Sequence, residues 1–112
     1  MDMLEILDQK TFVVVGDTLN EKKYAYKIKS SLLERGYKAF GVGKEKKSIN
    51  EIAEEIDIID LCINPIDGLK IIQECEKTFK CIVIQPHADN DALLSYLNEQ
   101  NIPYIQGCLL AA

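Results

Sequence analysis

The sequence predicts a small α/β protein in which a parallel β-sheet carries helices on both faces. Three observations carry this prediction: short apolar runs of strand length, amphipathic segments of helical period, and the regular alternation of the two along the chain. A chain of 112 residues is long enough for one hydrophobic core. We therefore expect a single domain over residues 1–112.

The first half of the chain predicts two strands and a long helix. Thr11 to Val15 is β-branched and aromatic, which is typical of a buried central strand. Glu21 to Arg35 has apolar residues at helical spacing, and Gly36 follows as a left-handed C-cap. Tyr37 to Val42 predicts the second strand. Residues 1–10 predict an additional helix packed on the core.

The second half predicts three further strands with helices between them. The strands are Ile58 to Ile63, Cys81 to Ile84 and Pro103 to Gln106. Ser48 followed by Glu51 forms a capping-box pattern, which predicts a short helix that extends to Ile56. Apolar residues at steps of three and four predict a helix from Leu69 to Phe79, and Asn90 is a suitable N-cap for the last helix. Such alternation indicates βαβ units.

Charge and composition narrow the classes of function. The net charge of −5 argues against a nucleic-acid-binding protein, but residues 16–47 carry nine basic and four acidic side chains. An anionic ligand therefore has one favourable region on the chain. No apolar run is long enough for a membrane helix, and we expect a cytoplasmic protein that does not bind membranes, as a monomer or homodimer.

The cysteines and acidic residues give no metal or catalytic pattern. Cys62, Cys75, Cys81 and Cys108 lack C-x-x-C spacing and are interpreted as reduced thiols without a bound metal. Asp57 and Asp60 bracket the third strand, as a turn residue and a strand-edge carboxylate. His87 is the only histidine, at a strand end where it could bind a ligand.

Ligands of open parallel sheets bind beyond the carboxyl ends of the strands, so the loops there are the candidate sites. The first loop has one glycine, Gly16, and lacks both the three-glycine dinucleotide fingerprint and the Walker phosphate loop. Binding of NAD or FAD is therefore disfavoured. A glycine, a threonine and a helix start in this loop are still able to hold a phosphate through backbone N–H groups.

The chain resembles the small CoA-binding-domain family, stand-alone relatives of the nucleotide domain in succinyl-CoA synthetase alpha subunits. The resemblance spans nearly all of the sequence. It is carried by the following segments: Val13-Val14-Val15-Gly16 with Asn20 and Lys23, Leu33-Glu34-Arg35-Gly36-Tyr37, Ile56-Asp57-Ile58-Ile59-Asp60, Asn64-Pro65, Val83-Ile84-Gln85-Pro86 and Asn101-Ile102-Pro103-Tyr104.

The resemblance implies a three-layer, Rossmann-like fold with five parallel strands in the order 3-2-1-4-5, and coenzyme A across the strand ends. It implies that the diphosphate faces Gly16, Thr18, Asn20 and Lys23. Val42 and Lys44 would flank the adenosine and its 3′-phosphate, while Asn64, Pro65, Gln85 and Pro86 would line the remaining wall, with His87 beside them. The function implied is non-catalytic binding of coenzyme A or an acyl-CoA, as a sensor or as a subunit of a larger assembly.

Three departures from the family pattern leave other functions open. Asp17-Thr18 replaces Ala-Ser, Gly43 replaces the start of an Asn-Pro pair, and His87 stands where glycine is usual. One alternative is a protein-interaction module that has kept the fold and lost the nucleotide. Another is an enzyme acting on a CoA ester through His87, with a partner protein completing its site.

Overall fold

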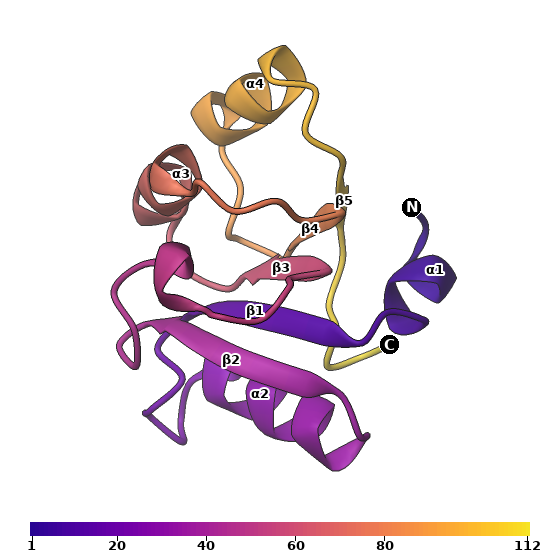
Figure 1. Ribbon diagram of the computed structural model, residues 1–112. Helices are drawn as coiled ribbons and strands as arrows, with labels where there is room; N and C mark the ends of the chain where they lie inside the picture. The colour runs from indigo at the N-terminus through magenta and orange to yellow at the C-terminus, as the bar shows by residue number, and fades with distance from the viewer.

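The computed structural model describes residues 1–112 and contains one five-stranded sheet between two layers of helices (Figure 1). The strands are β1 (Thr11–Gly16), β2 (Lys38–Gly43), β3 (Ile58–Leu61), β4 (Cys81–Ile84) and β5 (Tyr104–Gln106). The helices are α1 (Met3–Leu7), α2 (Tyr24–Glu34), α3 (Pro65–Glu74), α4 (Asp91–Glu99) and the 3₁₀ turn η1 (Ile49–Glu51). All four strand pairs are parallel, which confirms the predicted α/β fold.

The strand order is 2-1-3-4-5, so the expected order 3-2-1-4-5 is wrong. β3 lies between β1 and β4 because its four residues, including Asp60, are all buried and need a neighbour on each side. β2 carries the exposed Lys38 and is an edge strand instead. The connection after β1 leads to β2 on one side of the sheet, and the connection after β3 leads to β4 on the other side. The boundary between β1 and β3 is therefore the switch point of the sheet.

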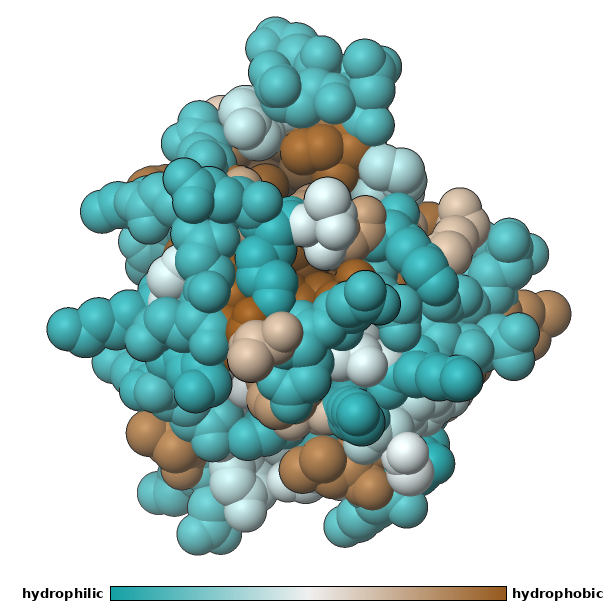
Figure 2. Space-filling model, viewed as in Figure 1, coloured by the Kyte–Doolittle hydropathy of each residue, from teal (hydrophilic) through white to brown (hydrophobic).

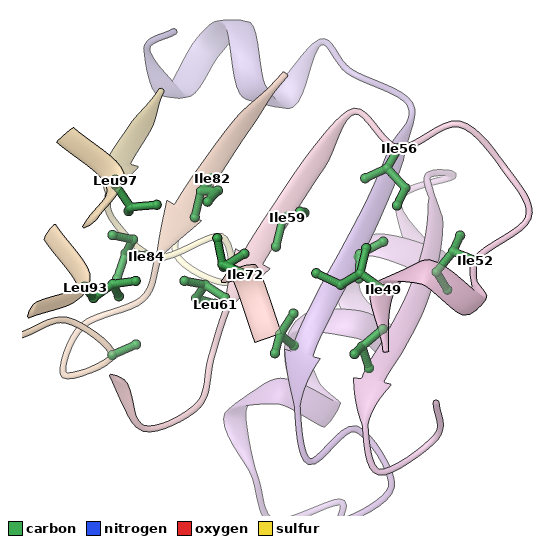
Figure 3. Packing of buried hydrophobic residues seen from close by; sticks show 14 residues of the cluster. Ile49, Ile52, Ile56, Ile59, Leu61, Ile72, Ile82, Ile84, Leu93 and Leu97 are labelled. Carbon is green, nitrogen blue, oxygen red and sulfur yellow. The ribbon is translucent and has the colours of Figure 1, made fainter. Parts of the chain in front are cut away.

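Two core clusters cover the two faces of the sheet. One contains Ile59, Ile82 and side chains from α3, α4 and the η1 segment (Figure 3). The other contains Phe12, Val14 and side chains from α1, α2 and the C-terminal segment. Figure 2 shows hydrophobic surface in the hollow at the centre of the viewed face, surrounded by polar side chains.

Most helix boundaries follow from local signals. Asn90 accepts a hydrogen bond from the backbone N–H of Leu93, as expected of an N-cap, and Gly36 has φ +92° at the end of α2. The capping box of Ser48 and Glu51 is present, but only η1 follows it. The backbone is already extended at Ile52 and does not continue as a helix. The side chains of Ile52 and Ile56 are buried in the core. α3 ends before Cys75, so Phe79 lies beyond it.

None of these helices combines the length and the apolar character needed to cross a membrane.

Candidate functional site

A cavity of about 360 Å³ opens at the carboxyl ends of β1, β3 and β4, next to the switch point of the sheet. We call it the strand-end cavity. Its lining comes from the loops after these three strands and from the first turn of α2. The residues are Asp17, Lys23, Tyr24, Ala25, Cys62, Ile63, Asn64, Gln85, Pro86, His87 and Ala88. Five of the residues implied by the resemblance, Lys23, Asn64, Gln85, Pro86 and His87, thus lie together.

The loop after β1 is closed by its own carboxylate. Asp17 Oδ1 accepts hydrogen bonds from the backbone N–H groups of Leu19 and Asn20, both at 3.2 Å. These are backbone donors of the kind that a phosphate uses in such a loop. The Asp17 side chain therefore occupies an anion position itself, and it also lines the strand-end cavity. Asn20 is exposed and does not line that cavity.

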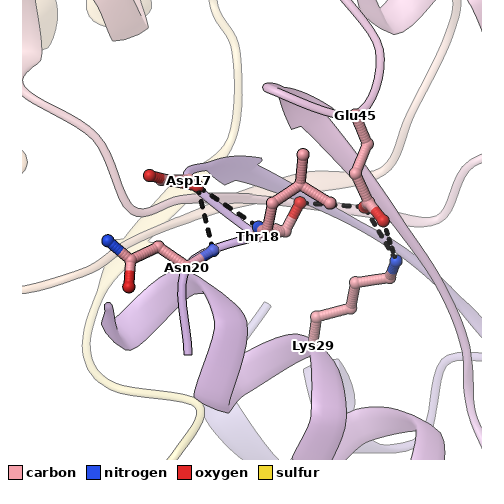
Figure 4. A network of polar contacts seen from close by, with 6 residues as sticks. Asp17, Thr18, Asn20, Lys29 and Glu45 are labelled. Carbon is pink, nitrogen blue, oxygen red and sulfur yellow. Dashed lines mark hydrogen bonds and ion pairs between the residues drawn. The ribbon is translucent and has the colours of Figure 1, made fainter. Parts of the chain in front are cut away.

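Thr18 connects the first loop to the second instead of facing the cavity. Its side chain is 3% exposed, and its hydroxyl donates to Glu45 at 2.8 Å (Figure 4). Lys29 on α2 donates to both oxygens of the same carboxylate, at 2.8 and 2.7 Å. Burial opposes ionisation of Glu45, but hydrogen bonds from Lys29 and Thr18 more than compensate and lower its pKa. This network fixes the loops after β1 and β2 to α2.

Gly16 lets the end of β1 pack closely against its neighbours. A Cβ atom at this position would lie 2.3 Å from the carbonyl oxygen of Cys62 and 2.9 Å from the Cβ of Ala25. The glycine thus brings the first turn of α2 against the end of β3. Gly16 therefore shapes the cavity wall but does not line the cavity itself.

The N-terminus of α2 lies at the strand-end cavity. Lys23 is the N-cap residue and makes no side-chain capping hydrogen bond. Lys23, Tyr24 and Ala25 all line the cavity, so the positive end of an eleven-residue helix and one lysine lie at the same wall. This wall is the part of the cavity that is suited to an anion.

The start of α3 forms the opposite wall. Asn64 is the N-cap: its side-chain oxygen accepts from the Asp67 N–H at 3.0 Å, and its Nδ2 donates to the Asp67 carboxylate at 2.7 Å. Pro65 follows at the first helical position, where its missing N–H costs nothing. The Asn64 side chain thus lines the cavity, while its polar atoms are hydrogen-bonded to Asp67 in the first turn of α3.

The loop after β4 also lines the strand-end cavity. Gln85 is 5% exposed, and its Oε1 accepts from the Leu109 N–H at 3.0 Å. His87 is exposed and has φ +71°, a left-handed conformation that is uncommon for a residue other than glycine. The backbone at this point therefore keeps the conformation that glycine would adopt, while carrying an imidazole at the rim.

The loop after β2 places its lysines differently from the expectation. Val42 has no exposed surface, and its side chain belongs to the core cluster. Lys44 is exposed and lines none of the cavities described here. Lys47 instead lines a second cavity of about 340 Å³ together with Lys70, Asp67 and Glu74 of α3. Ile63 lines both this lysine cavity and the strand-end cavity.

The sequence reasoning missed several residues of the site. Tyr24, Ala25, Cys62, Ile63, Ala88 and Lys47 line one of the two cavities but were not predicted. For Cys62 and Ile63 a signal was available, because they lie between the end of β3 and Asn64-Pro65. For Lys47 no local signal distinguishes it from Lys44.

Asp57 and Asp60 have different roles in the structure. Asp57 accepts from the N–H groups of Lys10 and Thr11 and pairs with Lys80 at 3.3 Å, as a turn residue that joins strand starts. Asp60 is not a strand-edge carboxylate as expected: it is fully buried in the central β3, and neither of its oxygens has a hydrogen-bond partner. Burial, and then the charge that Cys108 would carry as a thiolate, raise the pKa of Asp60 well above its usual value.

The cysteines are unpaired, and no group of three or more metal-ligating side chains converges. Burial, then the charge of Asp60, then Cys108, raise the pKa of the Cys62 thiol to about 12. A thiol of this kind is protonated at neutral pH, unlike an activated nucleophile.

Comparisons with known proteins agree with this architecture. Solved structures with the same fold include a conserved hypothetical protein from Pyrococcus furiosus, with 24% identity, 92% of this chain and 98% of that chain covered, and a TM-score of 0.84. A hypothetical protein from Pyrococcus horikoshii OT3 has 21% identity over 96% of this chain and 84% of its own, with a TM-score of 0.87. No curated protein matches the chain.

A protein from Thermus thermophilus has 21% identity, covers 99% of this chain and 96% of its own, and has a TM-score of 0.81. At such identities these three structures establish the fold alone. The family model described as "CoA binding domain" matches residues 10–112, which is almost the entire chain and every strand of the sheet. This chain therefore belongs to the CoA-binding domain family.

Proposed function

We propose that the chain binds coenzyme A in the strand-end cavity and that it does so without catalysing a reaction. The observation that carries the proposal is the coincidence of the family match with a cavity at the switch point of the sheet, where a helix N-terminus and Lys23 converge. The volume of about 360 Å³ is within the range of small-molecule sites.

The position of the two cavities on either side of Ile63 supports an extended ligand with anionic groups. The lysine cavity carries Lys47 and Lys70 beside the carboxylates of Asp67 and Glu74. We assign the 3′-phosphate to the loop after β2, which carries Lys44, Lys46 and Lys47. The diphosphate would then lie at the start of α2, near Lys23. Gly16, Thr18 and Asn20 shape that loop in this proposal, and Pro65 with Pro86 borders the ligand path.

A non-catalytic role is supported by the state of the thiol at the site. Cys62 is the only thiol that lines the strand-end cavity, and its raised pKa keeps it protonated. The exposed His87 at the rim then has no activated nucleophile to serve. A CoA-ester enzyme that uses His87 would need a second protein to supply the reacting group.

Melting experiments test binding directly. A ligand at a hundred times its dissociation constant stabilises the native state by about 2.7 kcal/mol. For a chain of this size each kcal/mol corresponds to a shift of about 4 °C, so coenzyme A should raise the melting temperature by about 10 °C. NAD is the matched nucleotide control and should give no shift. Dephospho-CoA should bind more weakly than coenzyme A, because it lacks the phosphate assigned to the second loop.

Asp17 provides the sharpest variant for this site. Removing one unit of like charge about 4 Å from a phosphate is worth about 1 kcal/mol at the dielectric constant of water, or about fivefold in affinity. Asp17→Asn keeps an oxygen for the Leu19 and Asn20 N–H groups and should tighten coenzyme A binding by about that factor. Asp91→Asn removes the same charge from α4, at a residue that does not line the cavity, and should leave the affinity unchanged.

A protein-interaction module without a nucleotide is the second candidate, and the closed first loop favours it. Asp17 already holds the loop donors that a phosphate would use, and Thr18 is tied to Glu45. The absence of any melting shift with millimolar coenzyme A, for the natural chain and for Asp17→Asn, would make this candidate the better account.

A further inference from the structure

A third cavity continues from the strand-end cavity and lies beneath the C-terminal segment. It has a volume of about 430 Å³ and is more enclosed than the strand-end cavity. We call it the thiol slot. It is lined by Tyr24, Cys62, Gln85, Pro86, His87 and Cys108. All of these except Cys108 also line the strand-end cavity, so the two spaces are continuous.

Hydrogen bonds hold the wall that Cys108 contributes. The next residue, Leu109, is fully buried, and its N–H donates to Gln85 at 3.0 Å. Arg35 donates to the carbonyl oxygen of Leu109 at 2.9 Å. The C-terminal segment is therefore fixed to α2 on one side and to the end of β4 on the other, which makes the slot part of the folded structure.

The slot offers no fixed positive side chain to a negative charge. Neither lysine nor arginine lines it, and its polar side chains are His87, Gln85, Tyr24 and the two thiols. Burial is the first cause that keeps Cys62 protonated at neutral pH. A carboxylate buried here would be desolvated without a lysine or arginine beside it, which is unfavourable, whereas an alkyl group would lose only its contact with water.

Asp60 lies one step deeper on the same face of β3. Residues two apart on a strand point to the same side, so Asp60 and Cys62 share the face that the C-terminal segment covers. The carboxyl is fully buried and has no hydrogen-bond partner. A second acid group placed in the slot would therefore meet a carboxyl below it rather than a cation.

We propose that the thiol slot binds the acyl group of an acyl-CoA and selects short, uncharged aliphatic acyl groups over acyl groups that carry a carboxylate. This inference rests on the proposed function, because the nucleotide in the strand-end cavity would deliver the thioester to the adjoining slot. Cys62 and Cys108 contact the acyl chain through their side chains, and no covalent transfer to the protein takes place.

Calorimetric titration with three ligands tests the inference. Butyryl-CoA and succinyl-CoA carry four-carbon acyl groups that differ in a terminal carboxylate, and coenzyme A carries none. Burial of three carbon groups predicts that butyryl-CoA binds about tenfold or more tightly than coenzyme A. Succinyl-CoA should bind at least tenfold more weakly than butyryl-CoA, because its carboxylate loses hydration in the slot and meets no lysine or arginine there.

Variants of Cys108 locate the effect in the slot. Cys108→Leu adds bulk from the C-terminal segment and should remove the advantage of butyryl-CoA while changing the affinity for coenzyme A by less than about twofold. Cys108→Ser preserves the size and should keep the preference. The comparison of the three ligands on the natural chain does not depend on either variant folding.

The outcomes separate the two proposals. If coenzyme A binds but butyryl-CoA is no tighter, or succinyl-CoA binds as well as butyryl-CoA, the slot assignment is wrong and the proposed function stands. If none of the three binds at millimolar concentration, both proposals are wrong. The expected order of affinities, lost in Cys108→Leu and kept in Cys108→Ser, would support both.

Discussion

Asp60 is the residue whose chemistry agrees least with its place in the fold. Strand β3 is flanked on both sides, and its other residues are apolar, yet this position carries a carboxyl without a hydrogen-bond partner. Burial favours the protonated form, because a neutral carboxyl loses far less hydration than a carboxylate. The residue therefore costs stability at neutral pH, which is typical of positions retained for reasons other than packing.

The pH dependence of stability tests this account. The folded chain keeps the Asp60 proton above pH 3.8, where the unfolded chain has released it. Its contribution is therefore complete below the unfolded pKa and is lost as the pH rises toward the raised folded value. Asp60→Asn cannot ionise, so its free energy of unfolding should exceed that of the natural chain by about 1 kcal/mol or more at pH 8.

Urea denaturation at a series of pH values measures this difference. The two chains should have similar stability near pH 4, and the advantage of Asp60→Asn should grow on going to pH 8. Asp57→Asn is the matched control, because the hydrogen bonds to that carboxylate lower its pKa despite burial, and its loss should destabilise the chain at neutral pH. Parallel curves for Asp60→Asn and the natural chain would show that Asp60 is not held protonated.

The individual site residues were predictable to the extent that they end a strand. Asn64, Gln85 and Pro86 follow apolar runs directly, and all carboxyl ends of a parallel sheet meet at one edge. The same reasoning does not show that the Val42 side chain is buried in the core or that Lys44 lines none of the cavities described. Which side chain of a loop turns inward depends on its tertiary contacts, here the Thr18–Glu45–Lys29 network, and these contacts are not visible in the sequence.

The strands and helices could be predicted from the sequence more readily than the order of the strands in the sheet. Each strand is a short apolar run, and the start of α4 is marked by a residue with a strong capping preference. The order of the strands depends instead on which of them can be an edge. The exposure of Lys38 on β2 and the full burial of β3 decide that question, and both are properties of the folded sheet.

The N-cap of α4 allows a quantitative test of one helix. Asn90 Oδ1 accepts from the Leu93 N–H at 2.8 Å, and Leu93 and Leu97 bury the helix against the sheet. Asn90→Ala leaves that N–H without its partner and should lower the free energy of unfolding by about 1 kcal/mol, or the melting temperature by about 4 °C. Asn90→Asp retains an acceptor and should change the melting temperature little. Equal losses in the two variants would show that the cap is not the cause.

Contacts between distant parts of the chain join the two layers into one body. The N–H of Lys38 donates to the Lys10 carbonyl, and Asp57 links the starts of β1 and β3. The C-terminal segment reaches α2 through Arg35 and β4 through Gln85. Tyr37 donates to the Leu7 carbonyl and packs edge-on against Phe12, with ring centroids 5.0 Å apart, which ties α1 to the same core. These contacts link α1, α2, the sheet and the C-terminal segment to one another.

We therefore expect the 112 residues to unfold in a single cooperative transition. At about 0.7 kcal/mol per residue near 60 °C, the calorimetric enthalpy of unfolding should be about 80 kcal/mol. For a two-state transition the van't Hoff enthalpy, obtained from the temperature dependence of the circular dichroism, should equal this value. If the β2–α2 part and the β4–β5 part were independent units, each would melt with a smaller enthalpy, and the van't Hoff value would be well below the calorimetric one. Such an inequality, or two resolved heat-capacity peaks, would show that the chain is not one domain.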